Sequence, residues 1–215
     1  ARAHFERALE IQEAAFGPVH PALAMPLSLL ARVERWLGDT ARAREHFERG
    51  FAIAERAHGP EHPDLVWMLV PYSRFLRLTG DPDTALEVLE RALTLSQATF
   101  GPDHLDTARV FEGFGYHYYG LRDFDEALRY FERGLAIRER VFGPNHRALG
   151  WNHYDRACIL ALKGDRAAAL DALREAVAVG WASPLILSDG DLDSLRGTPE
   201  FEALAEEVRG KLQTP

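Results

Sequence analysis

The sequence predicts an all-α fold in which antiparallel helix pairs stack into a solenoid. A Gly-Pro loop recurs at Gly17, Gly59, Gly101 and Gly143, so that successive copies are 42 residues apart. The segments between the loops carry apolar residues at helical spacing, and small residues recur at the same position of every copy. A fixed period of this size is typical of stacked repeats, in which one unit cannot bury its apolar face alone.

Each loop is expected to end one helix and begin the next. Gly takes the left-handed position past the end of a helix, and Pro cannot continue it. The loops also carry four histidines. These lie one repeat apart, and packed helices are roughly 10 Å apart, whereas the ligands of one metal ion lie about 2 Å from it. A structural role in the loop is therefore expected for His20, His62, His104 and His146.

A second turn divides each repeat into two helices, called here the first and the second helix. It contains an aspartate that can cap the following second helix, at Asp39, Asp81, Asp123 and Asp165. The register breaks after Val179, and Thr198-Pro199 predicts the start of a last helix. The predicted organisation is a half repeat over 1–16, repeats over 21–58, 63–100, 105–142 and 147–180, and a capping tail over 181–215 with its final helix near 199–212.

Three columns of small residues let the paired helices cross closely, because a larger side chain would hold their axes apart. The columns are Ala31, Ser73, Gly115 and Ala157; Ala43, Ala85, Ala127 and Ala169; and Gly50, Ala92, Gly134 and Ala176. This pattern resembles the tetratricopeptide repeat. The 42-residue period and the Gly-Pro-x-His-Pro loop resemble its kinesin light chain-type subclass, and the tail resembles those that close bacterial arrays. The resemblance implies a right-handed superhelical solenoid.

Composition narrows the classes of function. The 215 residues carry a net charge of −8, which argues against nucleic acid and against an anionic membrane surface as partners. No apolar run is long enough to span a bilayer. The single cysteine, Cys158, excludes an internal disulfide, suits a reducing compartment and favours a cytoplasmic location. Because the chain begins without Met, we expect it to be a fragment.

No residue set predicts catalysis. The sequence contains no Ser-His-Asp order, zincin motif or phosphate loop, so we expect neither an enzyme nor a cofactor. An acidic run from Asp189 to Asp193 gives only a weak calcium motif, since Ser194 stands where an EF-hand loop needs Gly. In the fourth repeat, His153 and Arg156 replace apolar residues, and we expect them to pair with this acidic run.

The resemblance further implies that the first helices line a concave groove that binds a peptide or a partner helix. The paired Asn that often grips the peptide backbone in the kinesin light chain type is absent. Trp, Tyr and Arg, which are enriched at interface hot spots, occupy several of the groove positions. An alternative role for Trp67 and Trp151 is packing between neighbouring repeats. The expected groove residues are Met25, Arg32, Trp67, Val70, Arg74, Arg109, Glu112, Tyr116, Trp151, Tyr154 and Asp155.

Two functions follow from these observations. The first is a non-catalytic scaffold that binds a protein or peptide ligand in the groove. The alternative, implied by the resemblance of the tail, is the C-terminal regulatory or sensing domain of a larger bacterial signalling enzyme, a serine/threonine kinase or an ATPase. We also expect weak self-association through the N-terminal helix, because Phe5, Leu9 and Ile11 would lack a covering first helix.

Overall fold

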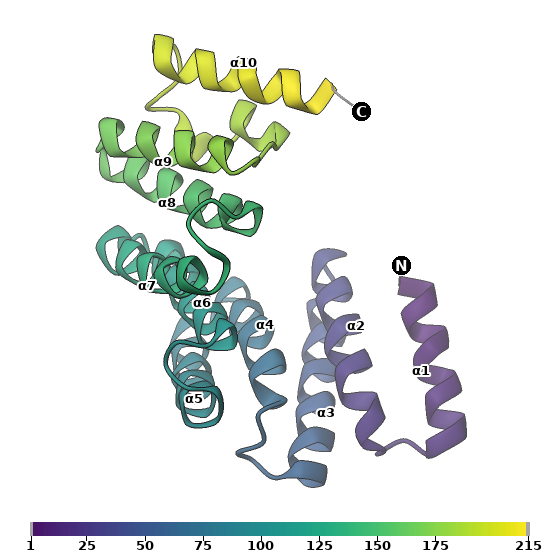
Figure 1. The fold of residues 1–215 in the computed structure, drawn as a ribbon. Helices are drawn as coiled ribbons and strands as arrows, with labels where there is room; N and C mark the ends of the chain where they lie inside the picture. Colours follow the sequence, from purple (N-terminus) through teal and green to yellow (C-terminus); the bar gives the residue numbers. More distant parts are fainter. Residues whose placement is uncertain (1, 214–215) are drawn as a thin grey trace. The chain divides into compact units, whose positions relative to one another are not determined.

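The computed structural model describes residues 2–213 and confirms the all-α fold of antiparallel helix pairs (Figure 1). These residues form ten α-helices and four short 3-10 helices, with no strand among them. The chain consists of two compact units, residues 1–102 (unit 1) and 103–215 (unit 2). No helix in the described part of the chain is both long and apolar enough to cross a membrane.

Unit 1 contains the N-terminal helix and two helix pairs. In each pair a first helix packs along the second helix that follows it, α2 with α3 and α4 with α5, while α1 lies beside α2 (Figure 1). The elements are α1 (Arg2–Phe16), η1 (Pro21–Leu23), α2 (Ala24–Trp36), α3 (Thr40–His58), α4 (Leu65–Leu78) and α5 (Pro82–Phe100).

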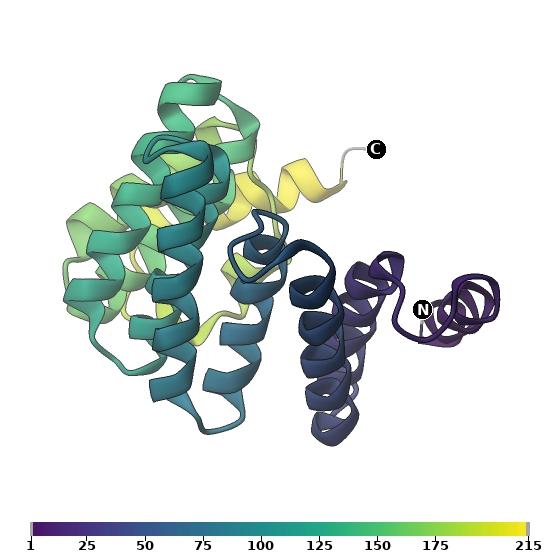
Figure 2. The same cartoon turned by 90° about the horizontal axis from the view of Figure 1, so that it is seen from below.

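Unit 2 contains two further pairs and the tail. Helix α6 packs on α7 and α8 on α9, again with antiparallel axes, and α10 packs on α9 (Figures 1 and 2). The elements are α6 (Leu105–Gly120), α7 (Phe124–Phe142), η2 (Arg147–Leu149), α8 (Gly150–Lys163), α9 (Arg166–Ala178), η3 (Pro184–Leu187), η4 (Gly190–Leu192) and α10 (Pro199–Gln213). The tail segment between α9 and α10 is therefore ordered into 3-10 turns and belongs to unit 2.

Local chemistry at the helix ends accounts for the boundaries. The expected aspartate caps are confirmed, because each accepts a hydrogen bond from the backbone N–H three residues later, at Asp39, Asp81, Asp123 and Asp165. After α3, Gly59 has φ of 89°, a conformation that strains any residue with a Cβ atom. The helix therefore ends at the Gly-Pro loop.

The loop histidines have the expected structural role. In each loop the histidine Nδ1 accepts a hydrogen bond from the backbone N–H two residues later, which begins the next first helix, at His20, His62, His104 and His146. The rings of Phe16 and Phe142 stack on His20 and His146, the histidines of their loops. In the second loop His58 packs against His62, with the ring centres 4.6 Å apart.

Small residues lie where the paired helices cross. Ala31 and Ala43 have no exposed surface, and a Cβ atom on Gly50 would lie 3.1 Å from the carbonyl oxygen of Ala24. At Gly115 an added Cβ would lie 2.9 Å from the ring of Phe131. The close approach of the two helices thus depends on these positions, as the sequence columns predict.

Candidate functional site

In unit 1, the expected groove residues share neighbouring surfaces of two first helices. Met25 and Arg32 lie on α2 and Trp67, Val70 and Arg74 on α4, and these two helices contact each other. Met25 is 41% exposed and Trp67 42%, which is high for side chains of this size and apolar character. Both arginines are exposed and Val70 is half-buried. We call this set, together with Arg35, the α2–α4 face.

Positive charge is concentrated at one end of the α2–α4 face. Arg35 was not among the groove residues expected from the sequence, but it lies close enough to Arg32 of the same helix and to Arg74 of α4 for both charges to act on it. Burial lowers the pKa of Arg35, and repulsion from Arg74 and Arg32 lowers it further. The sequence does indicate Arg35 as a candidate, because it follows Arg32 by three positions and residues three apart on a helix are neighbours. Three adjacent guanidinium groups in a protein of net charge −8 form a cluster suited to an anionic partner.

In unit 2, several of the corresponding side chains bond to one another. The hydroxyl of Tyr116 on α6 donates to Asp155 of α8 across 2.6 Å. Glu112 accepts hydrogen bonds from the guanidinium of Arg138, at 2.5 and 3.1 Å, and from Asn152 at 2.8 Å. The charge of Glu112 is thus compensated inside unit 2.

The Tyr154 side chain is buried against the tail. Its ring stacks on Trp181 with the ring centres 4.3 Å apart, and its hydroxyl donates to Asp189. Gly150 makes room for this contact, because a Cβ atom there would lie 2.7 Å from the Cβ of Trp181. Of the remaining expected positions, Trp151 is 54% exposed, Tyr116 37%, and Arg109 is half-buried.

The acidic residues of the tail form a small polar cluster with side chains of α6 and α8. Tyr119 donates to Asp191 across 2.8 Å, as Tyr154 does to Asp189 across 2.7 Å. Burial raises the pKa of both tyrosines, of Asp191 and, strongly, of the Cys158 thiol. One ligand atom each of Cys158, Asp189 and Asp191 lies within 4.8 Å of the others. A protonated thiol and two carboxylates that already accept hydroxyl protons form a clasp for the tail rather than a set of free ligands.

The expected pairing of His153 and Arg156 with this acidic run is wrong. His153 Nδ1 and Arg156 Nη1 both lie 3.1 Å from the same oxygen of Glu175 on α9. The two residues lie on a different side of α8 from Tyr154 and Cys158, and that other side contacts the tail. Arg156 is therefore paired within the fourth helix pair, whereas the buried His153 Nδ1 lies near Glu175 without forming a well-aligned hydrogen bond.

Comparison with known proteins agrees with this architecture. The sequence model of the tetratricopeptide repeat family matches residues 1–54, 23–70, 64–140 and 113–179. No curated protein matches the chain in sequence. Solved structures do resemble it in fold. BtubC (BKLC) from P. vanneervenii superimposes with a TM-score of 0.76 at 20% identity, over 100% of this chain and 91% of that one.

A second similar structure contains the nearly identical TPR-like repeats of a Podosopora anserina protein described as a kinesin light chain. It superimposes with a TM-score of 0.70 at 21% identity, over 90% of this chain and 96% of that one. A point variant of the same repeats gives 0.70 at 20% identity, over 89% and 95% of the two chains. The expected kinesin light chain-like fold is therefore confirmed. Because the family model matches most of its length, the chain belongs to the tetratricopeptide repeat family.

Proposed function

We propose that this protein is a non-catalytic interaction scaffold whose α2–α4 face binds an acidic peptide or partner helix. The observation that supports this is the combination of exposed Met25 and Trp67 with the cluster of Arg32, Arg35 and Arg74. Guanidinium groups bind carboxylates through paired hydrogen bonds, and aromatic side chains supply the apolar contact that fixes a peptide. Tetratricopeptide repeats in general mediate protein–protein interactions, which agrees with this role.

The apolar and the basic position on each helix are one fixed interval apart, from Met25 to Arg32 and from Trp67 to Arg74. This interval of about seven residues spans roughly 10 Å of α-helix, because each residue rises about 1.5 Å. A ligand with one bulky apolar residue about three extended residues away from an acidic cluster would reach both ends. Such a ligand also has a charge opposite to that of the arginine cluster and is repelled elsewhere on this acidic protein.

Unit 2 carries the weaker candidate surface. Arg109, Tyr116, Trp151 and Asp155 remain in the proposal as a separate, secondary contact surface of unit 2, although Tyr116 and Asp155 bond to each other. Tyr154 and Glu112 lie within internal networks, so a ligand would reach them only by displacing contacts the protein already makes. We therefore assign the primary recognition to unit 1.

Charge reversal on the α2–α4 face tests this function. A random peptide library selected on the protein is expected to yield acidic peptides with a bulky apolar residue. Replacing Arg32→Glu and Arg74→Glu together is expected to weaken the selected peptides at least ~10-fold, because attraction becomes repulsion. The matched control, Arg7→Glu with Arg56→Glu, makes the same change in net charge at exposed positions of α1 and α3 and should leave affinity unchanged. Equal loss in both variants, or selection of basic peptides, would refute the proposal.

The environment we propose for this scaffold is the cytoplasm. The single cysteine is buried and its thiol is held protonated, so the fold depends on no oxidising compartment. The net charge of −8 opposes nucleic acid and anionic lipid as competing partners.

As a second candidate, we propose that the scaffold serves as the C-terminal regulatory or sensing domain of a larger bacterial kinase or ATPase. The ordered tail favours this, since it is the element that carries the resemblance to arrays of that kind. The coding sequence upstream of Ala1 tests it. A kinase domain or a phosphate-binding loop there would support this candidate, and an uninterrupted run of further repeats would count against it.

A further inference from the structure

A pair of arginines three positions apart recurs on both first helices of unit 1. Helix α2 carries Arg32 and Arg35, and α4 carries Arg74 and Arg77 at the equivalent positions of the next repeat. Residues three apart on a helix are neighbours, so each pair forms one basic spot on its helix. In unit 2 the same two columns hold no basic residue, but Tyr116, Tyr119, Cys158 and Ala161. The doubled pair therefore distinguishes unit 1.

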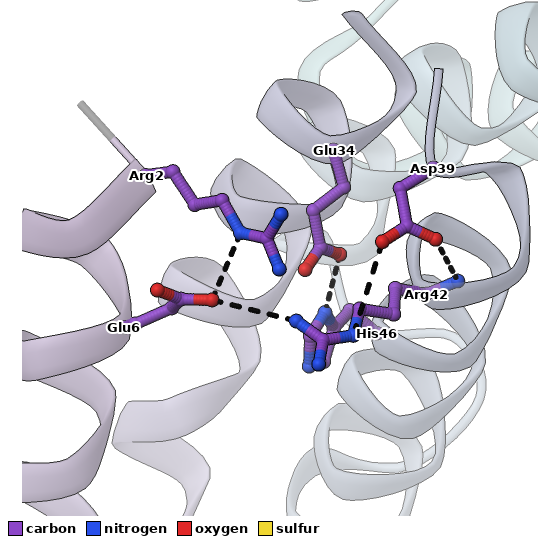
Figure 3. A network of polar contacts seen from close by, with 6 residues as sticks. All are labelled: Arg2, Glu6, Glu34, Asp39, Arg42 and His46. Carbon is purple, nitrogen blue, oxygen red and sulfur yellow. Dashed lines mark hydrogen bonds and ion pairs between the residues drawn. The ribbon is translucent and has the colours of Figure 1, made fainter. Parts of the chain in front are cut away.

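The helices that carry these arginines have the least negative charge in unit 1. Helix α4 contains no acidic residue, and α2 contains one, Glu34. Glu34 has no exposed surface, and Figure 3 shows its carboxylate directed toward His46 of α3, 2.6 Å from Nδ1. By contrast, α1, α3 and α5 carry three acidic residues each. The positive charge of α2 and α4 is therefore not balanced by acidic side chains on their own surfaces.

Two of the four arginines also lack a carboxylate partner on other helices. Among the described residues, neither Arg32 nor Arg35 forms an ion pair. Burial lowers the pKa of Arg35, and the charges of Arg74 and Arg32 lower it further. An anion with more than one charge would relieve this repulsion. Six other arginines of unit 1 do lie within 3.7 Å of a carboxylate oxygen, namely Arg2, Arg7, Arg42, Arg44, Arg49 and Arg91.

The basic columns stay accessible where two repeats pack together. Helix α4 has the first helix of the preceding repeat, α2, in contact with it. Arg74 and Trp67 of α4 are exposed all the same. Arg35 is half-buried on α2, and the charge of Arg74 reaches it from α4. The accessible cluster is thus built by two neighbouring helices that the structure describes in full.

The number of guanidinium groups favours a phosphate over a carboxylate. A carboxylate has one negative charge and two oxygens, which a single arginine can bind through two parallel hydrogen bonds. A phosphorylated serine or threonine carries a charge of roughly −1.5 to −2 at neutral pH and has three strong acceptor oxygens. It can therefore accept hydrogen bonds from arginines of two helices at once, and its charge matches a cluster of three cations better.

We propose that the arginines of α2 and α4 bind a phosphorylated serine or threonine of a partner protein, while a bulky apolar residue of the same segment contacts Met25 and Trp67. This inference rests on the peptide recognition proposed above and names its ligand more closely, because the acidic group is a phosphate rather than a carboxylate. The partner would then bind only after a kinase has modified it, so the interaction is switched by the state of the partner.

Three synthetic peptide libraries test the proposal on the unaltered chain. Each contains a phenylalanine about three residues from one fixed group, which is phosphoserine, a pair of glutamates of similar charge, or serine. The tightest member of each is then measured by fluorescence anisotropy. The phosphoserine peptide is expected to bind at least ~10-fold more tightly than the glutamate peptide, since one more charge-assisted hydrogen bond is worth about that factor. The serine peptide is expected not to bind measurably.

A single substitution locates the phosphate. Arg35→Met removes one guanidinium and keeps a long apolar stem at a half-buried position. It is expected to weaken the phosphoserine peptide at least ~10-fold and the glutamate peptide no more than ~3-fold, because one carboxylate is already filled by one arginine. The matched control, Arg56→Met, makes the same change in charge at an exposed position of α3 and should leave both affinities within ~2-fold.

The outcomes separate this inference from the function on which it rests. Equal affinity for the phosphoserine and glutamate peptides, with both lost in Arg32→Glu/Arg74→Glu, would overturn the phosphate and leave acidic peptide recognition standing. No binding of either peptide by a protein that circular dichroism shows to be folded would overturn both. Phosphoserine binding that a folded Arg35→Met variant retains would place the phosphate elsewhere. Binding to vesicles rich in phosphatidic acid, with no binding of the phosphoserine peptide, would assign the cluster to a lipid surface instead.

Discussion

Units 1 and 2 carry the same repeat columns, yet their first helices differ in what they leave exposed. In unit 1 one column contains Arg32 and Arg74, both exposed, and the pKa of Arg35 is lowered by burial and further by the charges of Arg74 and Arg32. In unit 2 the same column contains Tyr116, which bonds to Asp155, and Cys158, which is buried beside the tail. The repeat fixes where a side chain stands, and single departures from the column decide whether that side chain is exposed, as Arg32 is, or buried, as Cys158 is.

The units also differ in the contact between paired helices. In unit 1 the fully buried Glu34 faces His46, with Glu34 Oε2 and His46 Nδ1 only 2.6 Å apart (Figure 3). The second repeat has Leu76 and Val88 at these positions, and in unit 2 Tyr118 stacks on Tyr130. The polar pair therefore occupies a place that elsewhere holds apolar or aromatic contacts.

The largest effect is expected from the tail of unit 2. Trp181→Ala removes a ring that is 5% exposed and stacked on Tyr154, and truncating a buried aromatic costs about 3–5 kcal/mol of unfolding free energy. Trp67→Ala in unit 1 removes a ring that is 42% exposed and should cost less than about 1.5 kcal/mol. Urea denaturation followed by circular dichroism measures both. Similar losses would show that Trp67 is a core residue and would undermine the α2–α4 face.

The buried pair of unit 1 ranks next. His46→Val leaves Glu34 buried without its partner and is expected to lower the unfolding free energy by roughly 3 kcal/mol. Adding Glu34→Leu restores the combination found in the second repeat and should recover most of this loss, because apolar packing replaces buried ion pairs well. The same denaturation experiment gives both values. A double variant no more stable than His46→Val alone would show that the pair determines the packing of α2 and α3.

Most of the fold was predictable from the sequence because its determinants are local and repeated. The Gly-Pro loop recurs with a histidine that caps the next helix, and the aspartate before each second helix caps it in the same way. Close helix crossing follows from the small residues that repeat every 42 positions. Four copies of one pattern make such signals hard to misread.

The partners of non-repeating residues were not predictable in the same way. Nothing in the sequence places Glu175 rather than the tail opposite His153 and Arg156, since that depends on which side of α8 the tail covers. One feature of the sequence does indicate a contact of the tail. The equivalent residues of the four repeats are Ala24, Val66, Ala108 and Gly150, and glycine occurs only in the repeat on which Trp181 packs. A column that loses its side chain in one repeat indicates a contact with something outside the repeats.

A smaller effect is expected from acid. Burial lowers the pKa of His153, whose Nδ1 faces Glu175 and which also feels Arg156 and Glu139. Since the unfolded chain binds the proton more readily, stability should fall as the pH falls below the ordinary histidine value of 6.5. His153→Leu matches the column of Leu27 and Leu69 and should flatten this part of the profile of unfolding free energy against pH. An unchanged slope would show that Glu175 compensates the charged imidazole.

The smallest effect is expected where the tail meets Tyr119. Burial raises the pKa of Asp191 above its ordinary value of 3.8, so the folded state disfavours the ionised carboxylate. The protonated carboxyl group therefore contributes stability at low pH, and this contribution is lost as the pH rises through the folded pKa. Asp191→Asn removes the charge but keeps an oxygen that can accept the Tyr119 hydroxyl. Near neutral pH it should change the unfolding free energy by less than about 0.5 kcal/mol, whereas Asp191→Ala should cost about 1 kcal/mol through the lost hydrogen bond. A clear loss in Asp191→Asn, measured by urea denaturation, would mean that the negative charge itself fastens the tail. The tail of unit 2 would then depend on electrostatics in the same way as the arginine cluster of unit 1 is proposed to.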